Sequence, residues 1–221
     1  MGLHLAETCV ETSDRCLPPL EPVVQAEEAV ALHPLLARRR SSRALGGEPL
    51  PESTVTRLLE AARWAPSSGN RQPWSFIVVP REDTVGHTRV TELLTGRNGW
   101  WAPKAPLLVL ALARTRNPDG SAHPIALYDL GLAVGQLVVQ ASAQGLATHQ
   151  MGGFDKARAR EALEIPEGWE PVVLIAIGHA GPPGGVHEML RATETARRSR
   201  RPLEEIAFDG RFGRPRVRTD G

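Results

Sequence analysis

Three short apolar runs, separated by segments with helical periodicity, constrain the fold of this chain most. The runs occupy residues 76–79, 106–113 and 171–177, so each is four to eight residues long. Runs of this length are typical of buried strands, whereas buried helices are longer. Because the chain has no internal repeat, we expect an α/β fold in which helices cover one central sheet.

The helical segments between these runs have recognisable beginnings and ends. Pro34 suits the first turn of a short helix that ends at a group of arginines. A second helix begins at residues 50–53 and ends at Ala65, because a residue before proline avoids helical geometry. The most regular helix covers residues 125–144, and Gly145 is placed to end it. Weaker helices are predicted over residues 85–94 and 155–163.

The composition is that of an ordinary globular protein and argues against several kinds of partner. The 221 residues divide most simply into an extension at 1–26, one domain at 27–210 and a tail at 211–221. A formal charge of +1 gives no general attraction to nucleic acid or to anionic membranes. No apolar run approaches the roughly 20 residues that span a bilayer. Cys9 and Cys16 match neither a redox pair nor a zinc site, and free thiols suit the cytoplasm, where we expect this protein.

Motifs for several common chemistries are missing from the sequence. The chain contains no GxxxxGK[ST] loop, no GxGxxG, no HExxH and no GxSxG. P-loop, Rossmann, zinc-protease and nucleophile-elbow chemistry are therefore not indicated. The histidines do not cluster at metal-ligand spacing, so we expect no metal site. If the protein is an enzyme, a bound cofactor should carry its chemistry.

Residues 38–43, RRRSSR, concentrate positive charge and hydroxyl groups at the predicted end of the first helix. One interpretation is a solvated helix end, since cations are favoured at helix C-termini. A second is a nucleic-acid patch, although no aromatic residues are interleaved and the surrounding chain is not basic. A third is a phosphate clamp, in which guanidinium groups bind oxygens in bidentate fashion and a serine adds a donor.

A second polar segment, PSSGNRQPW at residues 66–74, joins the second helix to the first strand. It could be an ordinary connector, because Ser, Gly, Asn and Pro are common in loops. However, Asn70 and Gln72 each offer an amide with both donors and an acceptor, which suits the mixed polar edge of a planar ring. The two segments together favour a ligand with a dianionic phosphate and an amide-rich ring.

These motifs resemble the N-terminal half of the nitroreductase family. RRSSR, a short helix, APSSGNRQPW and an apolar strand follow one another in the order and spacing of that family. The C-terminal half agrees, because residues 145–155, the strand PVVLIAIGHA and residues 200–205 resemble later family blocks. The resemblance covers residues 35–208. It implies a mixed central sheet flanked by helices, and an intertwined homodimer with two FMN sites at the interface.

The resemblance also implies roles for individual residues. Arg39, Arg40 and Ser41 match contacts to the FMN phosphate and ribityl chain, and Arg43 matches a basic position near the phosphate or the pyrimidine edge. The other implied contacts are Ser67, Ser68, Asn70 and Gln72 for the ribityl chain and ring, Gln150, Met151, Gly152 and Gly153 in a loop near flavin N5, and Arg198 and Arg200 for the phosphate. No catalytic side chain is implied. The stretch at residues 181–197 is longer than the family pattern.

The implied activity is that of an FMN-dependent oxidoreductase. NAD(P)H gives a hydride to flavin N5 and leaves, and a nitroaromatic, quinone, enone or similar small molecule then accepts it. Two alternatives stay open: a specialised relative of the flavin-destructase, dehalogenase or azoline-oxidase type, and a non-catalytic flavin-binding or regulatory protein. Trp100 and Trp101 are expected either to line a short lid or to pack in the core or a dimer interface. Nothing in the sequence separates NADH from NADPH or identifies the acceptor.

Overall fold

The computed structural model describes residues 32–216. The predicted extension at 1–26, with Cys9 and Cys16, and residues 217–221 of the predicted tail lie outside these residues. The chain divides into two units, one ending at Arg39 and the other beginning at Arg40. Within the first unit, α1, Pro34–Arg38, begins after His33, whose Nδ1 accepts a hydrogen bond from the backbone N–H of Leu35 at 3.3 Å. All other described elements belong to the second unit.

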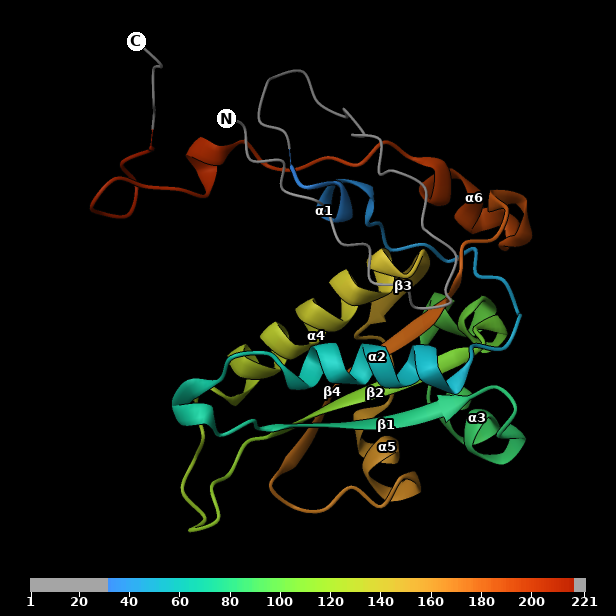
Figure 1. Ribbon diagram of the computed structural model, residues 1–221, viewed down its shortest axis with the longest axis horizontal. Helices are drawn as coiled ribbons and strands as arrows, with labels where there is room; N and C mark the ends of the chain where they lie inside the picture. The colour runs from blue at the N-terminus through green and yellow to red at the C-terminus, as the bar shows by residue number, and fades with distance from the viewer. Residues whose placement is uncertain (1–31, 217–221) are drawn as a thin grey trace, which may run out of the picture. The chain divides into compact units, whose positions relative to one another are not determined.

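The second unit is built on a four-stranded sheet in the order β1-β2-β4-β3 (Figure 1). The strands are β1, Trp74–Pro80, β2, Leu107–Arg114, β3, Leu146–Met151, and β4, Trp169–His179. Every neighbouring pair of strands is antiparallel. The family resemblance implies a mixed sheet. Among residues 32–216, the parallel pairing is limited to one bridge between Ser41 and Thr148.

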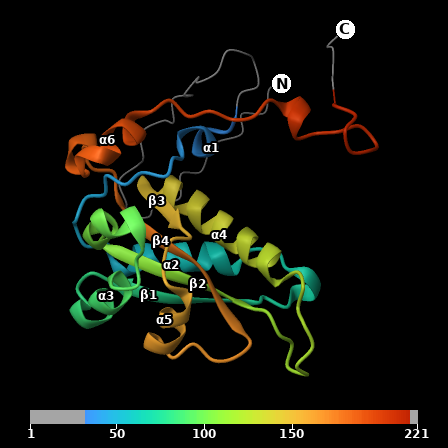
Figure 2. The same cartoon turned by 180° about the vertical axis from the view of Figure 1, so that it is seen from behind.

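Helices cover both faces of the sheet (Figures 1 and 2). On one face lie α2, Glu52–Arg63, and α4, Ala126–Ala143. On the other lie α3, Thr84–Thr91, and α5, Lys156–Ala162, and α6, Glu188–Thr195, packs against the same core cluster. Short 3-10 helices occupy η1, Ser68–Asn70, η2, Gly96–Trp100, η3, Ala102–Lys104, η4, Pro183–Gly185, and η5, Leu203–Glu205. The predicted class, helices around a central sheet, is confirmed.

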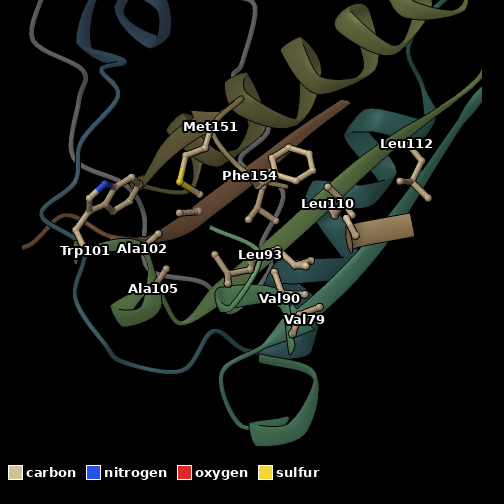
Figure 3. Close-up of a cluster of buried hydrophobic side chains, with 14 of the residues drawn as sticks. Val79, Val90, Leu93, Trp101, Ala102, Ala105, Leu110, Leu112, Met151 and Phe154 are labelled. Atoms are coloured by element: carbon tan, nitrogen blue, oxygen red, sulfur yellow. The ribbon is translucent and has the colours of Figure 1, made fainter. Parts of the chain in front are cut away.

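Strand β2 explains why the strands appear in the sequence as continuous apolar runs. Every residue of β2 except Arg114 is buried, because helices cover both faces of the sheet. Leu110 and Leu112 point into the cluster of Figure 3, whereas Leu107 and Val109 pack with α2 and α4. The same packing accounts for α4. Its 18 residues are apolar enough to cross a membrane by length and composition alone, but 44% of them are buried within the fold.

The structure confirms the predicted helices and the three apolar strands, and it adds two elements that the sequence did not indicate. One is β3, Leu146–Met151, where no strand was expected, and the assignment of its last residues Gln150 and Met151 to a loop is wrong. Polar Thr148 and His149 hide the strand pattern, although both side chains are buried. The second addition is α6, in a stretch of mixed charge whose structure the sequence left open.

Candidate functional site

Residues 40–46, which we call the arginine–serine segment, run beside β3 and across the end of β4. Ser41 forms its parallel bridge with Thr148, and Leu45 forms an antiparallel bridge with Ala180. The backbone N–H of Gly46 donates to the carbonyl of His179 at 2.8 Å. Residues 40–46 therefore lie at the edge of the sheet, with a bend at Arg43, next to the strand that leads to Gly152 and Gly153. Arg39, the remaining predicted clamp residue, is the C-cap of α1 in the first unit.

A buried glutamate on α6 holds this segment through three groups of residues 42–44. The carboxylate of Glu194 accepts hydrogen bonds from the backbone N–H of Arg43, at 3.0 and 3.2 Å to its two oxygens, and from that of Ala44 at 3.4 Å. It also accepts a hydrogen bond from the hydroxyl of Ser42. Glu194 is 6% exposed and Ser42 is 7% exposed. These donors of residues 42–44 therefore face the protein interior.

Glu194 is ionised in spite of its burial. Burial alone would raise the pKa of its carboxyl group. Hydrogen bonds from Ser42 and from the backbone of Arg43 and Ala44, together with the charge of Arg40, more than offset this effect and lower the pKa below its ordinary value. A carboxylate with a lowered pKa is charged at neutral pH.

Arg40 completes the same connection from the opposite direction. Its Nη2 donates to the backbone carbonyl of Glu194 and to that of Ala196 at 3.4 Å. Ala196 is the C-cap of α6, so Arg40 satisfies carbonyl groups at a helix C-terminus. The helix-end interpretation of the arginine cluster thus has a physical counterpart, but the helix is α6 and not the predicted first helix.

His149 supports the segment from β3. It is 8% exposed, and its ring centroid lies 4.7 Å from that of Trp101. Burial lowers the pKa of His149, and the charge of Arg43 lowers it further, while hydrogen bonds to the backbone of Ser42 and Ser41 act in the opposite sense. The imidazole is therefore neutral at neutral pH.

The two adjacent tryptophans have different environments. Trp101 is 2% exposed and belongs to the core cluster of Figure 3. Trp100 is 40% exposed, and its ring lies 4.7 Å from that of His187 at the start of α6. Core packing is thus confirmed for Trp101, whereas Trp100 offers an aromatic surface that could face an acceptor.

The loop at residues 67–72 is fixed by its own hydrogen bonds. The hydroxyl of Ser67 accepts from the backbone N–H of Gln72 at 2.9 Å, and the Gln72 amide donates to Asn70 Oδ1 at 3.1 Å. Asn70 and Gln72 have φ angles of 52° and 47°, in the left-handed region that side chains other than glycine rarely adopt. The backbone N–H of Ser68 donates to Asp129 Oδ2 of α4 at 3.2 Å. Strained backbone held in place by surrounding contacts is found preferentially at functional sites.

The end of β3 and the two glycines after it present backbone, and only some of their side chains are available to a ligand. The Met151 side chain is 2% exposed and lies in the core cluster of Figure 3, so only its backbone could contact a cofactor. The Gln150 amide donates to the Thr148 hydroxyl at 3.3 Å. The carbonyl of Gly153 accepts from Asn98 Nδ2 at 3.0 Å, and a Cβ on Gly153 would lie 2.8 Å from that nitrogen.

Gly152, by contrast, has open space on the side where a Cβ would stand. A flat ring could therefore approach the backbone closely there. The predicted C-terminal cations lie beyond α6. Arg198 is half-buried, and exposed Arg200 donates to the carbonyl of Ser199 at 2.7 Å.

The two predicted halves of the site lie far apart in one chain. The strand register places Trp74, which follows loop 67–72, in the row of Glu170 on β4. Through its bridge to β3, Ser41 lies in the row of Ile177. Seven residues along β4 correspond to roughly 23 Å at about 3.3 Å per residue. The second unit therefore does not bring the loop and the arginine–serine segment into contact.

The donor chemistry near β3 fits the phosphate end of FMN. Arg40 and Arg43 provide guanidinium groups and Ser41 a hydroxyl, next to a strand that leads to the open backbone of Gly152. Among residues 32–216, no group of three or more histidine, cysteine or carboxylate side chains is placed to hold a metal ion. The sequence did not identify Glu194, His149 or Asp129, because each acts through contacts with residues distant along the chain.

Comparisons with known proteins agree on one family. The model of the nitroreductase family matches residues 36–97 and 82–179, which together span more than half of the chain. A solved structure of an oxidoreductase containing FMN is 34% identical, with a TM-score of 0.79 over 86% of this chain and 96% of that one. The NADH dehydrogenase of Thermus thermophilus is 27% identical over 195 residues, 74% of this chain and 90% of its own length. Iodotyrosine deiodinase 1 of Rattus norvegicus is 26% identical over 186 residues, 72% of this chain and 65% of its own length.

Proposed function

The chain belongs to the nitroreductase family and is an oxidoreductase, and we propose that it uses FMN to transfer hydride from NAD(P)H to a small organic acceptor in a ping-pong reaction. The observation that carries this proposal is the bridge between Ser41 and Thr148, which places Arg40 and Ser41 beside the strand that ends just before the open backbone of Gly152. Similarity to a protein that contains FMN and to an NADH dehydrogenase supports the cofactor and the reductant. We place the enzyme in the cytoplasm, where NAD(P)H is supplied.

In this proposal the protein binds and orients the cofactor, and no side chain acts as a nucleophile. The cations Arg39, Arg40 and Arg43, with the hydroxyl of Ser41, would hold the phosphate. Bound FMN would supply the two-electron chemistry, accepting a hydride and passing it on. The backbone at Gly152 would lie against the ring near N5, and the fixed amides of Asn70 and Gln72 would bind ring or ribityl oxygens and nitrogens. Arg198 and Arg200 would add positive charge at the phosphate.

A complete site requires a second copy of the chain in this proposal. Loop 67–72 and Ser41 are separated by roughly 23 Å along the sheet, so the loop of one copy would meet the arginine–serine segment of its partner. A surface for this contact lies on α4, where Tyr128, Gly131, Gly135 and Val139 form one exposed stripe. The stripe borders a groove of about 520 Å³ between α2 and α4. Its glycines would allow close approach of a partner helix.

Subunit complementation tests the shared site. One chain carries Arg39→Ala with Ser41→Ala, and the other carries Asn70→Ala with Gln72→Ala. Each homodimer should purify largely without flavin. A mixed dimer isolated through two affinity tags should regain one FMN per dimer, because one of its two sites combines both intact halves. A mixed dimer without flavin, or a wild-type monomer saturated with FMN, would reject the shared site.

The activity itself is tested by an absorbance spectrum of the purified protein, followed by anaerobic addition of NADPH and then NADH. We expect a yellow protein that releases FMN on denaturation and loses its flavin absorbance on addition of at least one nucleotide. A screen of nitroaromatics, quinones and enones would then identify acceptors. A colourless protein that also fails to bind added FMN would refute the proposal, and a yellow protein that is not reduced would favour a binding role.

A second candidate, reductive dehalogenation, is favoured by the similarity to iodotyrosine deiodinase 1. In such a reaction a carbon–iodine bond is broken, two electrons and a proton are consumed, and iodide leaves while hydrogen takes its place on the ring. Release of iodide from iodotyrosine by the reduced protein, faster than reduction of nitroaromatics, would select this candidate. Turnover of nitroaromatics or quinones without iodide release would select the first.

A further inference from the structure

We propose that Glu194 is a positioning residue that sets the geometry of the phosphate clamp, an inference that rests on the proposed function. Its carboxylate accepts hydrogen bonds from the Ser42 hydroxyl and from the backbone N–H groups of Arg43 and Ala44. Arg40 donates in return to the carbonyl of Glu194 itself. The contacts run in both directions between residues 40–44 and the C-terminal end of α6. We call these reciprocal contacts the α6 latch.

The α6 latch decides which groups of the segment are available to a phosphate. Two successive N–H groups and a hydroxyl would themselves form an anion site, but the carboxylate of Glu194 already occupies it. A bound anion would therefore be held from the other side of the segment, by the guanidinium groups of Arg40 and Arg43 together with Ser41. The burial of the side chains agrees with this division, since Ser42 and Ala44 are buried, whereas Ser41 is exposed and Arg43 is half-buried.

The carboxylate of Glu194 is both buried and charged, so its contacts must compensate for the water that it has lost. Burying an ionised group is unfavourable when it is not paired and hydrogen-bonded. Glu194 is 6% exposed but charged, because three donors and Arg40 compensate for the lost water. A glutamine side chain could not accept hydrogen bonds on both of its terminal atoms, because its amide nitrogen only donates. The backbone N–H of Arg43 contacts both carboxylate oxygens, so an amide in this place would set one N–H against another.

The α6 latch also links the arginines of residues 40–43 to the C-terminal cations Arg198 and Arg200. Arg198 follows Glu194 by four residues and Arg200 by six. Anchoring the end of α6 to residues 40–44 therefore fixes the point from which the C-terminal cations extend. On this argument the negative charge of Glu194 repels a nearby phosphate, but the ordering of several cationic donors outweighs that repulsion. Removing the charge of Glu194 would strengthen FMN binding if the repulsion dominated, and it would weaken FMN binding if the ordering of the donors dominated.

The test compares the affinities of FMN and riboflavin, which differ only in the phosphate, for the wild type, Glu194→Gln and Glu188→Gln. Glu188 is exposed at the start of the same helix, so its substitution removes the same charge without disturbing the α6 latch. Flavin-free protein is titrated with each flavin, and fluorescence quenching gives the dissociation constants. Amide hydrogen exchange at Arg43 and Ala44 provides a reading of the α6 latch that requires no cofactor.

We expect Glu194→Gln to bind FMN at least about tenfold more weakly, with riboflavin affinity unchanged within about twofold, because only phosphate contacts are misplaced. Exchange at Arg43 and Ala44 should accelerate, and Glu188→Gln should match the wild type. If Glu194→Gln does not fold, Ser42→Ala removes one donor from the same carboxylate and should give a smaller loss that is again selective for FMN.

Unchanged or tighter FMN binding by Glu194→Gln would overturn the inference, and so would equal losses for FMN and riboflavin. These outcomes require a wild type that binds FMN, so they leave the proposed function intact. A wild type that binds neither flavin would instead refute the proposed function, and the phosphate role of Glu194 would fall with it.

Discussion

Replacing Asp129 by alanine should lower the free energy of unfolding by about 1–3 kcal/mol and loosen the loop at residues 67–72. Asp129 lies in the first turn of α4 and is 1% exposed. Its Oδ2 accepts a hydrogen bond at 3.2 Å from the backbone N–H of Ser68, the first residue of η1. The contact therefore ties the loop that carries Asn70 and Gln72 to the core helix.

Two opposing terms set this magnitude. Alanine leaves the partly buried N–H of Ser68 without its acceptor, which costs about 1–3 kcal/mol. Removing a buried carboxylate also removes the unfavourable loss of its hydration, which favours the lower part of that range. Asp129→Asn separates the terms, because its amide oxygen can still accept the hydrogen bond although the charge is gone. We expect the asparagine variant to lie within about 1 kcal/mol of the wild type.

Urea denaturation followed by circular dichroism gives the free energies, and thermal melting gives a second reading. For a chain of this size, each kcal/mol corresponds to about 2–4 °C in Tm. FMN titration of the same variants tests the functional consequence, because a loosened loop should bind the ring more weakly in Asp129→Ala than in Asp129→Asn. Equal stability of the wild type and Asp129→Ala would show that this hydrogen bond does not hold the loop. Equal losses in the two variants would assign the effect to the charge.

Four further substitutions, one of them a control, test separate parts of the structure. Gly178→Ala should lower the free energy of unfolding, measured in urea, by about 1–3 kcal/mol, because its Cβ would lie 2.8 and 2.9 Å from ring atoms of Pro106. The control Gly152→Ala, whose Cβ would have nothing within 4 Å, should change this free energy by less than about 0.5 kcal/mol. Equal effects of the two substitutions would contradict the packing argument. His149 has a lowered pKa, chiefly through burial, so the stability it contributes is complete above its ordinary value of 6.5 and is lost as the pH falls through the folded-state pKa. Urea denaturation between pH 5 and 8 should therefore show a smaller acid loss for His149→Gln than for the wild type, and parallel profiles would show that the histidine does not titrate in this way. Gly135→Trp should yield a folded monomer by light scattering, because it blocks the exposed stripe of α4, and a dimeric variant would place the interface elsewhere.

Local physical chemistry made most of the fold predictable. Pro66 marks the end of α2 because it restricts the residue before it, and Gly145 follows α4 with a φ of 72° that favours glycine. Asp155 caps α5 by accepting a hydrogen bond from the backbone N–H of Arg158 at 3.0 Å. Each of these signals acts within a few residues of its effect. Such local signals can therefore be identified from the sequence of one protein.

β3 shows where such signals fail. Its residues Thr148, His149 and Gln150 are polar, so neither an apolar run nor a regular alternation is visible. The strand is nevertheless buried, because β4 pairs with one side of it and Ser41 bridges to it from the arginine–serine segment. Its polar residues lie next to that segment, since Thr148 bridges to Ser41 and the charge of Arg43 helps to lower the pKa of His149. A strand whose side chains serve a site does not carry the pattern of one whose side chains only fill a core.

The proposed site shows the same separation between local and distant information. The arginines, serines and amides could be identified as ligands because their chemistry is intrinsic to the side chains. What holds them could not be identified, since Glu194 and Asp129 reach their partners across 150 and 61 residues of sequence. Nothing in the sequence near either carboxylate indicates that contact. Substitutions of the supporting residues are therefore more informative about this site than substitutions of the predicted ligands.

Each half of the proposed site is already rigid within a single chain, and this bears on how the site would assemble. Loop 67–72 keeps positive φ angles at Asn70 and Gln72 through its own hydrogen bonds, and residues 40–44 are fixed by Glu194. Ordering a flexible segment on binding would reduce the affinity for flavin. Two halves that are rigid before they meet avoid that loss, so association of two chains would need only to bring them together. On this argument, substitutions on the exposed face of α4 should remove FMN and the dimer together, whereas Glu194→Gln should weaken FMN binding in a dimer that still forms.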